Sequence, residues 1–185
     1  MLKEGDKIPS FSVQNSKGDT ITNDNIKGKK VILYFYPKDD TSGCTKEAQS
    51  FTEHKPEFDK KNIEIYGISK DSVKKHEKFC AKYEFQHELL SDENSSLCED
   101  FGVWKEKSMY GKKYMGIVRS TFLVDENGTI IKSWENVKVP GHVENVLENC
   151  WFQYVNSEPP AKLMHWPVNC LFSSKKSIVC NSSDS

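Results

Sequence analysis

The chain lacks the features that mark several common classes of protein. Its longest unbroken apolar run, Val31 to Tyr36, is far shorter than the roughly 18 residues of a membrane-spanning helix. Its 26 basic and 27 acidic residues nearly cancel, so charge gives no reason to expect nucleic acid or a membrane surface as a partner. The first residues, Met1–Asp6, include acids where a signal peptide has an apolar stretch. We therefore expect a cytoplasmic protein that binds neither nucleic acid nor membrane.

Cysteine pairs of the kind found in metal ribbons are also missing. The six cysteines stand at positions 44, 80, 98, 150, 170 and 180, with no Cys-x-x-Cys pair among them. This spacing argues against a zinc ribbon and against a redox motif with two neighbouring thiols. A disulfide-rich secreted scaffold is also disfavoured, because the chain is long and shows no signal sequence. The remaining interpretation is a chain of mostly reduced thiols, any of which is a candidate reactive group.

Arginine is almost absent, because Arg119 is the single arginine among the 26 basic residues. A preference for lysine explains the other basic residues but not the position of the exception, which directly precedes the strand-like run Ser120–Val124. Arginine has a planar fork of donors and a permanent charge that lysine cannot copy. The position therefore suggests a site residue, with chance placement as the alternative.

Strand-like and helical segments alternate along the chain. A weak alternation around the turn Ser16–Asp19 predicts an N-terminal hairpin within residues 8–22. Further strands are expected at 31–36, 63–69, 88–90, 115–124 and 129–134, and helices at 45–60, 71–83, 92–101 and 143–154. Asp71 or Ser69 is the expected N-cap of the second helix. The order predicts an α/β thioredoxin-like fold, in which helices flank a central mixed β-sheet.

The C-terminal part of the chain has a different character. Beyond Val155 the sequence has no apolar periodicity, contains Pro159-Pro160, and ends rich in serine and lysine. We therefore expect one domain over residues 1–155 and a partly disordered tail over residues 156–185.

Cys44 has the most informative surroundings of the six cysteines. A buried strand ends at Pro37, a polar loop follows, and the cysteine stands at the predicted start of a helix. Free backbone N–H groups and the helix dipole stabilise a thiolate at such a position, and Thr41 brings a hydroxyl within reach of the sulfur. The alternative is a buried cysteine at an ordinary helix start.

These residues together resemble a known family. The pattern Pro37-x-x-x-Thr41-x-x-Cys44 resembles the reactive loop of peroxiredoxins, and the surrounding residues resemble the bacterioferritin comigratory protein / peroxiredoxin Q group. Ser42 departs from the proline usual there. The matching segments are residues 34–48, 89–92, 116–125 and 139–142, and the resemblance extends over about residues 3–152.

The resemblance implies an enzyme that reduces hydrogen peroxide and organic hydroperoxides with a thiol. It implies that Cys44 is the peroxidatic nucleophile, that Thr41 and Arg119 complete its site, and that Pro37 shields it. Glu47 would orient Arg119, although an acid in the first turn of a helix is also favourable without any such role. Donors that hold both peroxide oxygens stabilise the transition state as the O–O bond stretches.

A sulfenic acid on Cys44 needs a second thiol to return to the cycle. Many members of the group carry that thiol five residues further on, where this chain has Gln49. A subset has it on the following helix, which makes Cys80 the expected resolving cysteine and an intramolecular disulfide reduced by thioredoxin, or a similar thiol reductant, the expected product. The resemblance also favours a monomer. No cofactor and no metal are expected, although the spacing of His76 and Cys80 fits two metal ligands on one helix face.

Two other functions stay open on the sequence alone. One is a peroxidase with a single active cysteine, whose sulfenic acid is resolved by an external thiol such as glutathione. The other is a thioredoxin-fold binding module without turnover, which would have no need of Thr41, Cys44 and Arg119 together.

Overall fold

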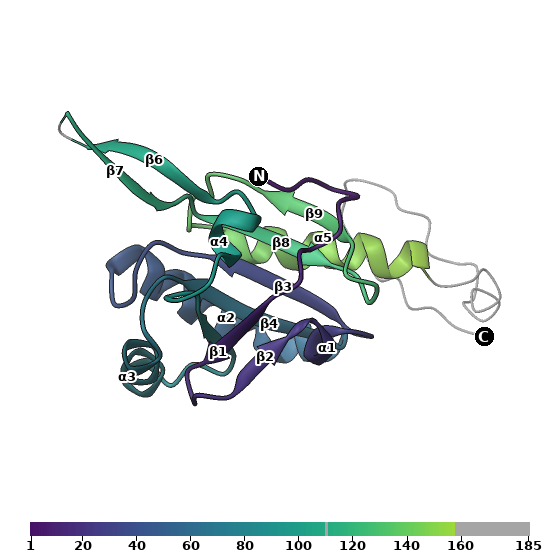
Figure 1. Ribbon diagram of the computed structural model, residues 1–185. Helices are drawn as coiled ribbons and strands as arrows, with labels where there is room; N and C mark the ends of the chain where they lie inside the picture. The colour runs from purple at the N-terminus through teal and green to yellow at the C-terminus, as the bar shows by residue number, and fades with distance from the viewer. Residues whose placement is uncertain (110, 158–185) are drawn as a thin grey trace, which may run out of the picture.

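A mixed sheet of seven strands forms the centre of the molecule (Figure 1). The computed structural model describes residues 1–109 and 111–157. The strands lie in the order β2-β1-β5-β4-β3-β8-β9. Their bounds are β1 Ser12–Asn15, β2 Thr20–Thr22, β3 Lys30–Phe35, β4 Ile63–Ser69, β5 Glu88–Ser91, β8 Ser120–Val124 and β9 Ile130–Trp134. Only the β3–β4 and β4–β5 pairs are parallel, so the predicted mixed sheet is confirmed.

Strand β3 is buried on both faces, as its continuous apolar run predicts. Val31, Leu33 and Phe35 pack into the core on one side of the sheet. Ile32 and Tyr34 pack into the core on the other side, together with Tyr36, which follows the strand. Because successive side chains of a strand alternate between faces, one run of residues supplies both cores.

Three helices share one face of the sheet. They are α2 (Ser42–Asp59), α3 (Val73–Tyr83) and α5 (His142–Ser157), and residues of all three join the core that contains Ile32 and Tyr34. Helices α2 and α3 connect the parallel pairs β3–β4 and β4–β5. Successive crossovers of the same hand place both helices on one face and therefore side by side. The other face is covered by the N-terminal segment and by α4 (Leu97–Asp100), while the short α1 (Asn23–Ile26) follows β2.

A projecting hairpin is the main difference from the predicted elements. Residues 115–124 were expected to form one strand, but they divide into the end of β7 (Lys112–Ile117) and β8, and β7 pairs with β6 (Trp104–Met109). This hairpin extends from the body of the molecule in Figure 1. Its lysine-rich sequence has few apolar residues to bury, so hydrophobic periodicity does not detect it.

The predicted starts of α3 and α4 were also wrong. Helix α4 was expected to begin at Asp92, but it begins at Leu97, because the buried Asp92 carboxylate instead accepts bonds from the backbone N–H groups of Leu97 and Cys98. Helix α3 has Ser72 as its N-cap residue, in place of Asp71 or Ser69. In both cases a carboxylate near the helix start bonds to another segment or to the first turn.

Helix α5 is described as far as Ser157, two residues into the predicted tail. The rest of that tail, with Cys170 and Cys180, lies outside the described residues. Over the parts that the structure does describe, none of the helices has the length and hydrophobicity needed to cross a membrane.

Candidate active site

Cys44 lies at the start of α2, at the end of the loop that follows β3. Thr41 is the N-cap residue, with the extended backbone (φ −95°, ψ 148°) typical of that position, and Cys44 is the third residue of the helix. The first N–H groups of a helix have no partner within it, and Cys44 belongs to this first turn. The helix begins three residues earlier than the predicted start at Thr45, and the cysteine is 2% exposed.

Arg119 reaches Cys44 because β8 lies beside β3. The two strands pair antiparallel, with Phe35 opposite Ser120, so the residue before β8 lies where β3 ends. The Arg119 Nη2 donates to the Cys44 sulfur at 3.1 Å. A Cβ atom on Gly43 would lie 3.5 Å from Nη2, so the guanidinium rests against the first turn of α2. The single arginine of the chain therefore belongs to the site.

Glu47 holds the other arm of the guanidinium. It lies one turn after Cys44, is fully buried, and accepts a bond from Arg119 Nη1 on its Oε2. Burial raises the pKa of Glu47 to about 7, against the lowering effect of Arg119. Burial lowers the pKa of Arg119, but Glu47 and Cys44 outweigh it and leave that pKa raised. The second carboxylate oxygen, Oε1, has no partner among the described residues.

Thr41 and Pro37 lie in the same loop but make different contacts. The Thr41 hydroxyl donates to the Lys38 carbonyl at 3.1 Å, while the Thr41 carbonyl accepts from the N–H of Thr45. Within the described part of the chain, the hydrogen bond to the sulfur comes from Arg119 and none comes from the Thr41 hydroxyl. Pro37 is exposed and follows the buried Tyr36. The structure thus joins Cys44, Glu47 and Arg119 by hydrogen bonds and has Thr41 and Pro37 nearby in sequence.

The other described cysteines have surroundings unlike those of Cys44. Cys80, on α3, is half-buried and packs against the same core as Cys44, and burial raises its pKa. Cys98 and Cys150 are almost fully buried, and burial raises the pKa of Cys150 to about 12. The four described cysteines are all free thiols, so Cys44 and Cys80 are not joined in this form.

Two aspartates of the loop were missed by the sequence reasoning. Asp39 contacts His76 of α3, with its Oδ2 2.7 Å from the ring Nδ1. Asp40 accepts from Lys82 and Tyr83, also on α3. No sequence signal separates these aspartates from ordinary loop acids, because their partners lie about 40 residues away along the chain. His76 thus has a carboxylate partner, and the described residues contain no group of three metal-ligating side chains.

A buried cysteine, held by a guanidinium at a helix start on a thioredoxin-like sheet, defines a class of enzymes that use one thiol as a nucleophile. The AhpC/TSA family model matches residues 4–133 of the chain. Peroxiredoxin Bcp of Bacillus subtilis is 45% identical over 147 residues, which are 80% of this chain and 94% of that protein. The chain belongs to the AhpC/TSA family, among its Bcp and peroxiredoxin Q peroxidases.

Solved structures agree with this assignment. The bacterioferritin comigratory protein of Xanthomonas campestris, known for its alkyl peroxide reduction activity, is 43% identical with a TM-score of 0.74, over 77% of this chain and 91% of that one. Two cysteine-to-serine mutants of Xanthomonas campestris peroxiredoxin Q, at positions 48 and 84 of that protein, are each 44% identical with TM-scores of 0.74. Each match covers 77% of this chain. It covers 90% of the position-48 mutant and 91% of the position-84 mutant. The predicted family and fold are confirmed.

Proposed function

We propose that this peroxidase uses Cys44 as its peroxidatic nucleophile, and that its substrates are hydrogen peroxide and organic hydroperoxides. The observation that carries the proposal is the 3.1 Å contact between Arg119 Nη2 and the Cys44 sulfur at a buried helix start. The alkyl peroxide reduction activity of the Xanthomonas campestris relative supports organic hydroperoxides as one substrate class.

The first step is attack of the Cys44 thiolate on one peroxide oxygen. An S–O bond forms, the O–O bond breaks, and the departing alkoxide or hydroxide takes up a proton, leaving a sulfenic acid on Cys44. Negative charge moves from sulfur to the departing oxygen during this step. Arg119 and the first N–H groups of α2 are fixed hydrogen-bond donors for the charge that develops on the departing oxygen. A site preorganised in this way stabilises the transition state more than the bound peroxide.

Three neighbours support Cys44 in this proposal. Glu47 positions Arg119 by occupying Nη1, so that Nη2 stays directed at the sulfur. Thr41 turns its hydroxyl from the Lys38 carbonyl to the bound peroxide, a rotation that needs only one side-chain torsion. Pro37 covers the entrance to the loop and limits the access of water.

Cys80 is the proposed resolving thiol. Its sulfur attacks the Cys44 sulfenic acid, a disulfide forms, and water leaves. Cys80 follows Cys44 by 36 residues, which is also the spacing between the two mutated cysteines of the Xanthomonas campestris peroxiredoxin Q. Both residues pack on the core that α2 and α3 share. We propose thioredoxin as the reductant of this disulfide, in a monomeric cytoplasmic enzyme.

The test is to add one equivalent of hydrogen peroxide to the reduced protein and to identify the oxidised cysteines by peptide mass spectrometry. The expected product is a Cys44–Cys80 disulfide, with Cys98 and Cys150 still reduced. Consumption of peroxide should then continue when thioredoxin, its reductase and NADPH are supplied. A stable sulfenic acid, or a mixed disulfide formed only with added glutathione, would support the single-cysteine enzyme in its place.

A further inference from the structure

The loop that leads to Cys44 contacts α3 at two positions, one before and one after Cys80 in the sequence. The inner contact joins Asp39 to His76, one turn before Cys80, with 2.7 Å between Oδ2 and Nδ1. His76 is fully buried, and its Nε2 lies 3.2 Å from the Leu90 carbonyl, so both ring nitrogens face acceptors. The Tyr36 hydroxyl donates to the other oxygen of Asp39 at 2.7 Å.

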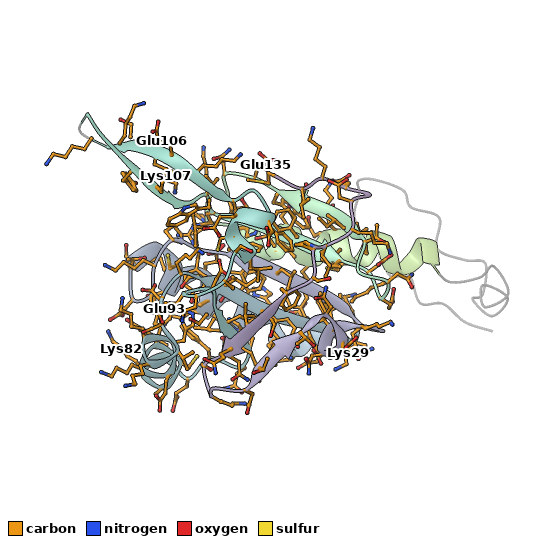
Figure 2. All side chains as sticks on the ribbon, in the orientation of Figure 1. Lys29, Lys82, Glu93, Glu106, Lys107 and Glu135 are labelled. Carbon is orange, nitrogen blue, oxygen red and sulfur yellow. The ribbon has the colours of Figure 1, made fainter. Side chains whose placement is uncertain are left out.

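The outer contact joins Asp40 to the last turn of α3. The Lys82 ammonium lies 2.8 Å from both Asp40 carboxylate oxygens, and the Tyr83 hydroxyl donates to one of them at 2.8 Å. Lys82 lies on α3 at the surface of the molecule (Figure 2). Asp40 adopts a left-handed backbone conformation (φ 55°), which glycine, asparagine and aspartate adopt more readily than other residues.

We propose that these contacts form a clamp that sets how quickly Cys80 resolves the Cys44 sulfenic acid. The aspartate clamp consists of Asp39 and Asp40 with their partners His76, Lys82 and Tyr83. It joins the two segments that carry the two cysteines, the loop before α2 and the helix α3. This inference rests on the proposed role of Cys80 as the resolving thiol.

The aspartate clamp should slow resolution if its contacts are present in the thiol form of the protein and absent from the disulfide form. Cys44 and Cys80 are free thiols on two different helices, with Cys44 buried under Arg119. A disulfide needs two Cα atoms within about 7 Å, and the proposal includes a movement of the first turn of α2 or of the segment around Cys80 that brings the two sulfurs together. Contacts that are made in the thiol form and broken in the disulfide form slow that movement. The aspartate clamp therefore prolongs the life of the sulfenic acid.

A longer-lived sulfenic acid is exposed to a competing reaction. A second peroxide oxidises it to the sulfinic acid, with release of one alcohol or water, and Cys44 then leaves the cycle. The share of Cys44 lost in this way measures the ratio of the competing rate to the rate of resolution. Weakening the aspartate clamp should therefore protect the enzyme from inactivation by its own substrate.

The variant Lys82→Met/Tyr83→Phe tests this at the outer contact, because it removes the ammonium and the hydroxyl that bind Asp40 and keeps the aromatic ring at position 83. Two quantities are measured: the rate of disulfide formation after rapid mixing with hydrogen peroxide, and the peroxide concentration at which half of Cys44 becomes sulfinic acid during turnover. We expect both to rise about threefold or more. Asp40→Asn should act in the same direction, because asparagine tolerates the left-handed backbone and lacks the charge.

Lys78→Met is the matched control, because it removes an exposed lysine one turn earlier on α3 that takes no part in the clamp. It should leave both quantities at the wild-type level. In a Cys80→Ser background, the clamp variant should no longer change the yield of sulfinic acid, because the resolving thiol is gone. That result would show that the clamp acts through Cys80.

Two outcomes would overturn the inference, and they separate it from the proposed function. If Cys80→Ser raises the yield of sulfinic acid but Lys82→Met/Tyr83→Phe leaves both quantities unchanged or lowers them, the clamp is wrong and the resolving role of Cys80 stands. If Cys80→Ser itself does not raise the yield, the resolving role is wrong and the clamp fails with it.

Discussion

Cys44 and Cys80 pack against the same core, but their surroundings differ in almost every other respect. Cys44 is nearly fully buried, with a guanidinium donating to its sulfur and a buried carboxylate behind that guanidinium. Cys80 is half-buried, and burial raises its pKa. One thiol is held in a preorganised site, and the other is held mainly through the helix that carries it.

In the proposed catalytic cycle, this difference corresponds to two different demands on the two thiols. A nucleophile that meets peroxide at low concentration needs a charged, fixed surrounding before the substrate arrives. A resolving thiol has to reach a sulfenic acid that is already formed in the same chain, so access matters as well as activation. The substitutions described next change one of the two thiols, or one residue around Cys44, at a time.

The largest effect is expected from Cys44→Ser, which removes the nucleophile with little change in volume. Peroxide consumption with dithiothreitol as reductant should fall to the uncatalysed rate, because a serine hydroxyl does not form a sulfenic acid. Circular dichroism should show an unchanged fold. Cys150→Ala serves as the control thiol and should retain activity, and substantial activity in Cys44→Ser would disprove the proposed role.

Cys80→Ser should stop turnover with thioredoxin after one round while leaving the first reaction with peroxide intact. The sulfenic acid on Cys44 then has no protein thiol to attack it. Stopped-flow mixing should show the first step at the wild-type rate, and mass spectrometry should find sulfinic acid on Cys44. Normal cycling with a Cys44–Cys98 or Cys44–Cys150 bond would reassign the resolving thiol.

Arg119→Lys should lower kcat/KM for hydrogen peroxide by a factor of about 10 or more, which corresponds to about 1.4 kcal/mol of transition-state stabilisation. Lysine keeps the charge but cannot donate to Glu47 and to the sulfur in two fixed directions at once. Steady-state kinetics at low peroxide concentration provide the measurement. A wild-type rate would reduce Arg119 to a structural residue.

Glu47→Gln is expected to change stability rather than the catalytic rate, and the change depends on pH. The pKa of Glu47 is about 7 in the folded chain against a usual value of 4.5, so the folded state binds this proton more tightly than the unfolded state. The contribution of this proton to the free energy of unfolding is therefore fully present below pH 4.5. It is lost as pH rises through 7, and the total loss is about 3 kcal/mol.

Urea unfolding at pH 5 and pH 8 measures this loss in the wild type and in Glu47→Gln. The fall in the free energy of unfolding should be smaller in the variant, because glutamine carries no titrating proton. The buried His87 and His142, whose pKa values are lowered to about 3 and about 4 by burial, act equally in both proteins and cancel in the comparison. An identical fall in both proteins would show that Glu47 does not titrate in this range.

The smallest effect is expected from removing residues 158–185. This stretch lacks the apolar periodicity needed to bury a face, so activity and melting temperature should stay close to those of the full chain. Thermal unfolding followed by circular dichroism provides the measurement, and a drop of several degrees would indicate packing against the domain.

The sequence predicted those parts of the fold that depend on local pattern. The apolar run of β3, the bounds of β4 and the position of Cys44 at a helix start follow from burial, β-propensity and capping, all of which are properties of neighbouring residues. The unusual position of Arg119 also pointed to the site, since one arginine among many lysines stands out by composition alone.

The contacts of Asp39 and Asp40 with α3 could not be predicted, because they depend on which helix packs beside the loop. The same holds for the burial of Glu47. With the helix predicted to start at Thr45, this residue reads equally well as a solvent-exposed acid of the first turn, but the helix starts at Ser42 and Glu47 lies beyond its first turn. The β6–β7 hairpin was missed because Lys105, Lys112 and Lys113 give it the composition of a loop. Pairing of backbone groups, which leaves little trace in composition, forms that hairpin.

The contact between Arg119 and Cys44 spans 75 residues of sequence. It exists only once β8 has paired with β3, one of the most distant pairings in the sheet. A chain that is still being synthesised, or one that is partly unfolded, therefore carries Cys44 without its guanidinium donor. If Cys44 has the proposed role, rapid reaction with peroxide becomes a property of the completed sheet, and its appearance during refolding should report the docking of β8 more directly than any spectroscopic probe of helix content.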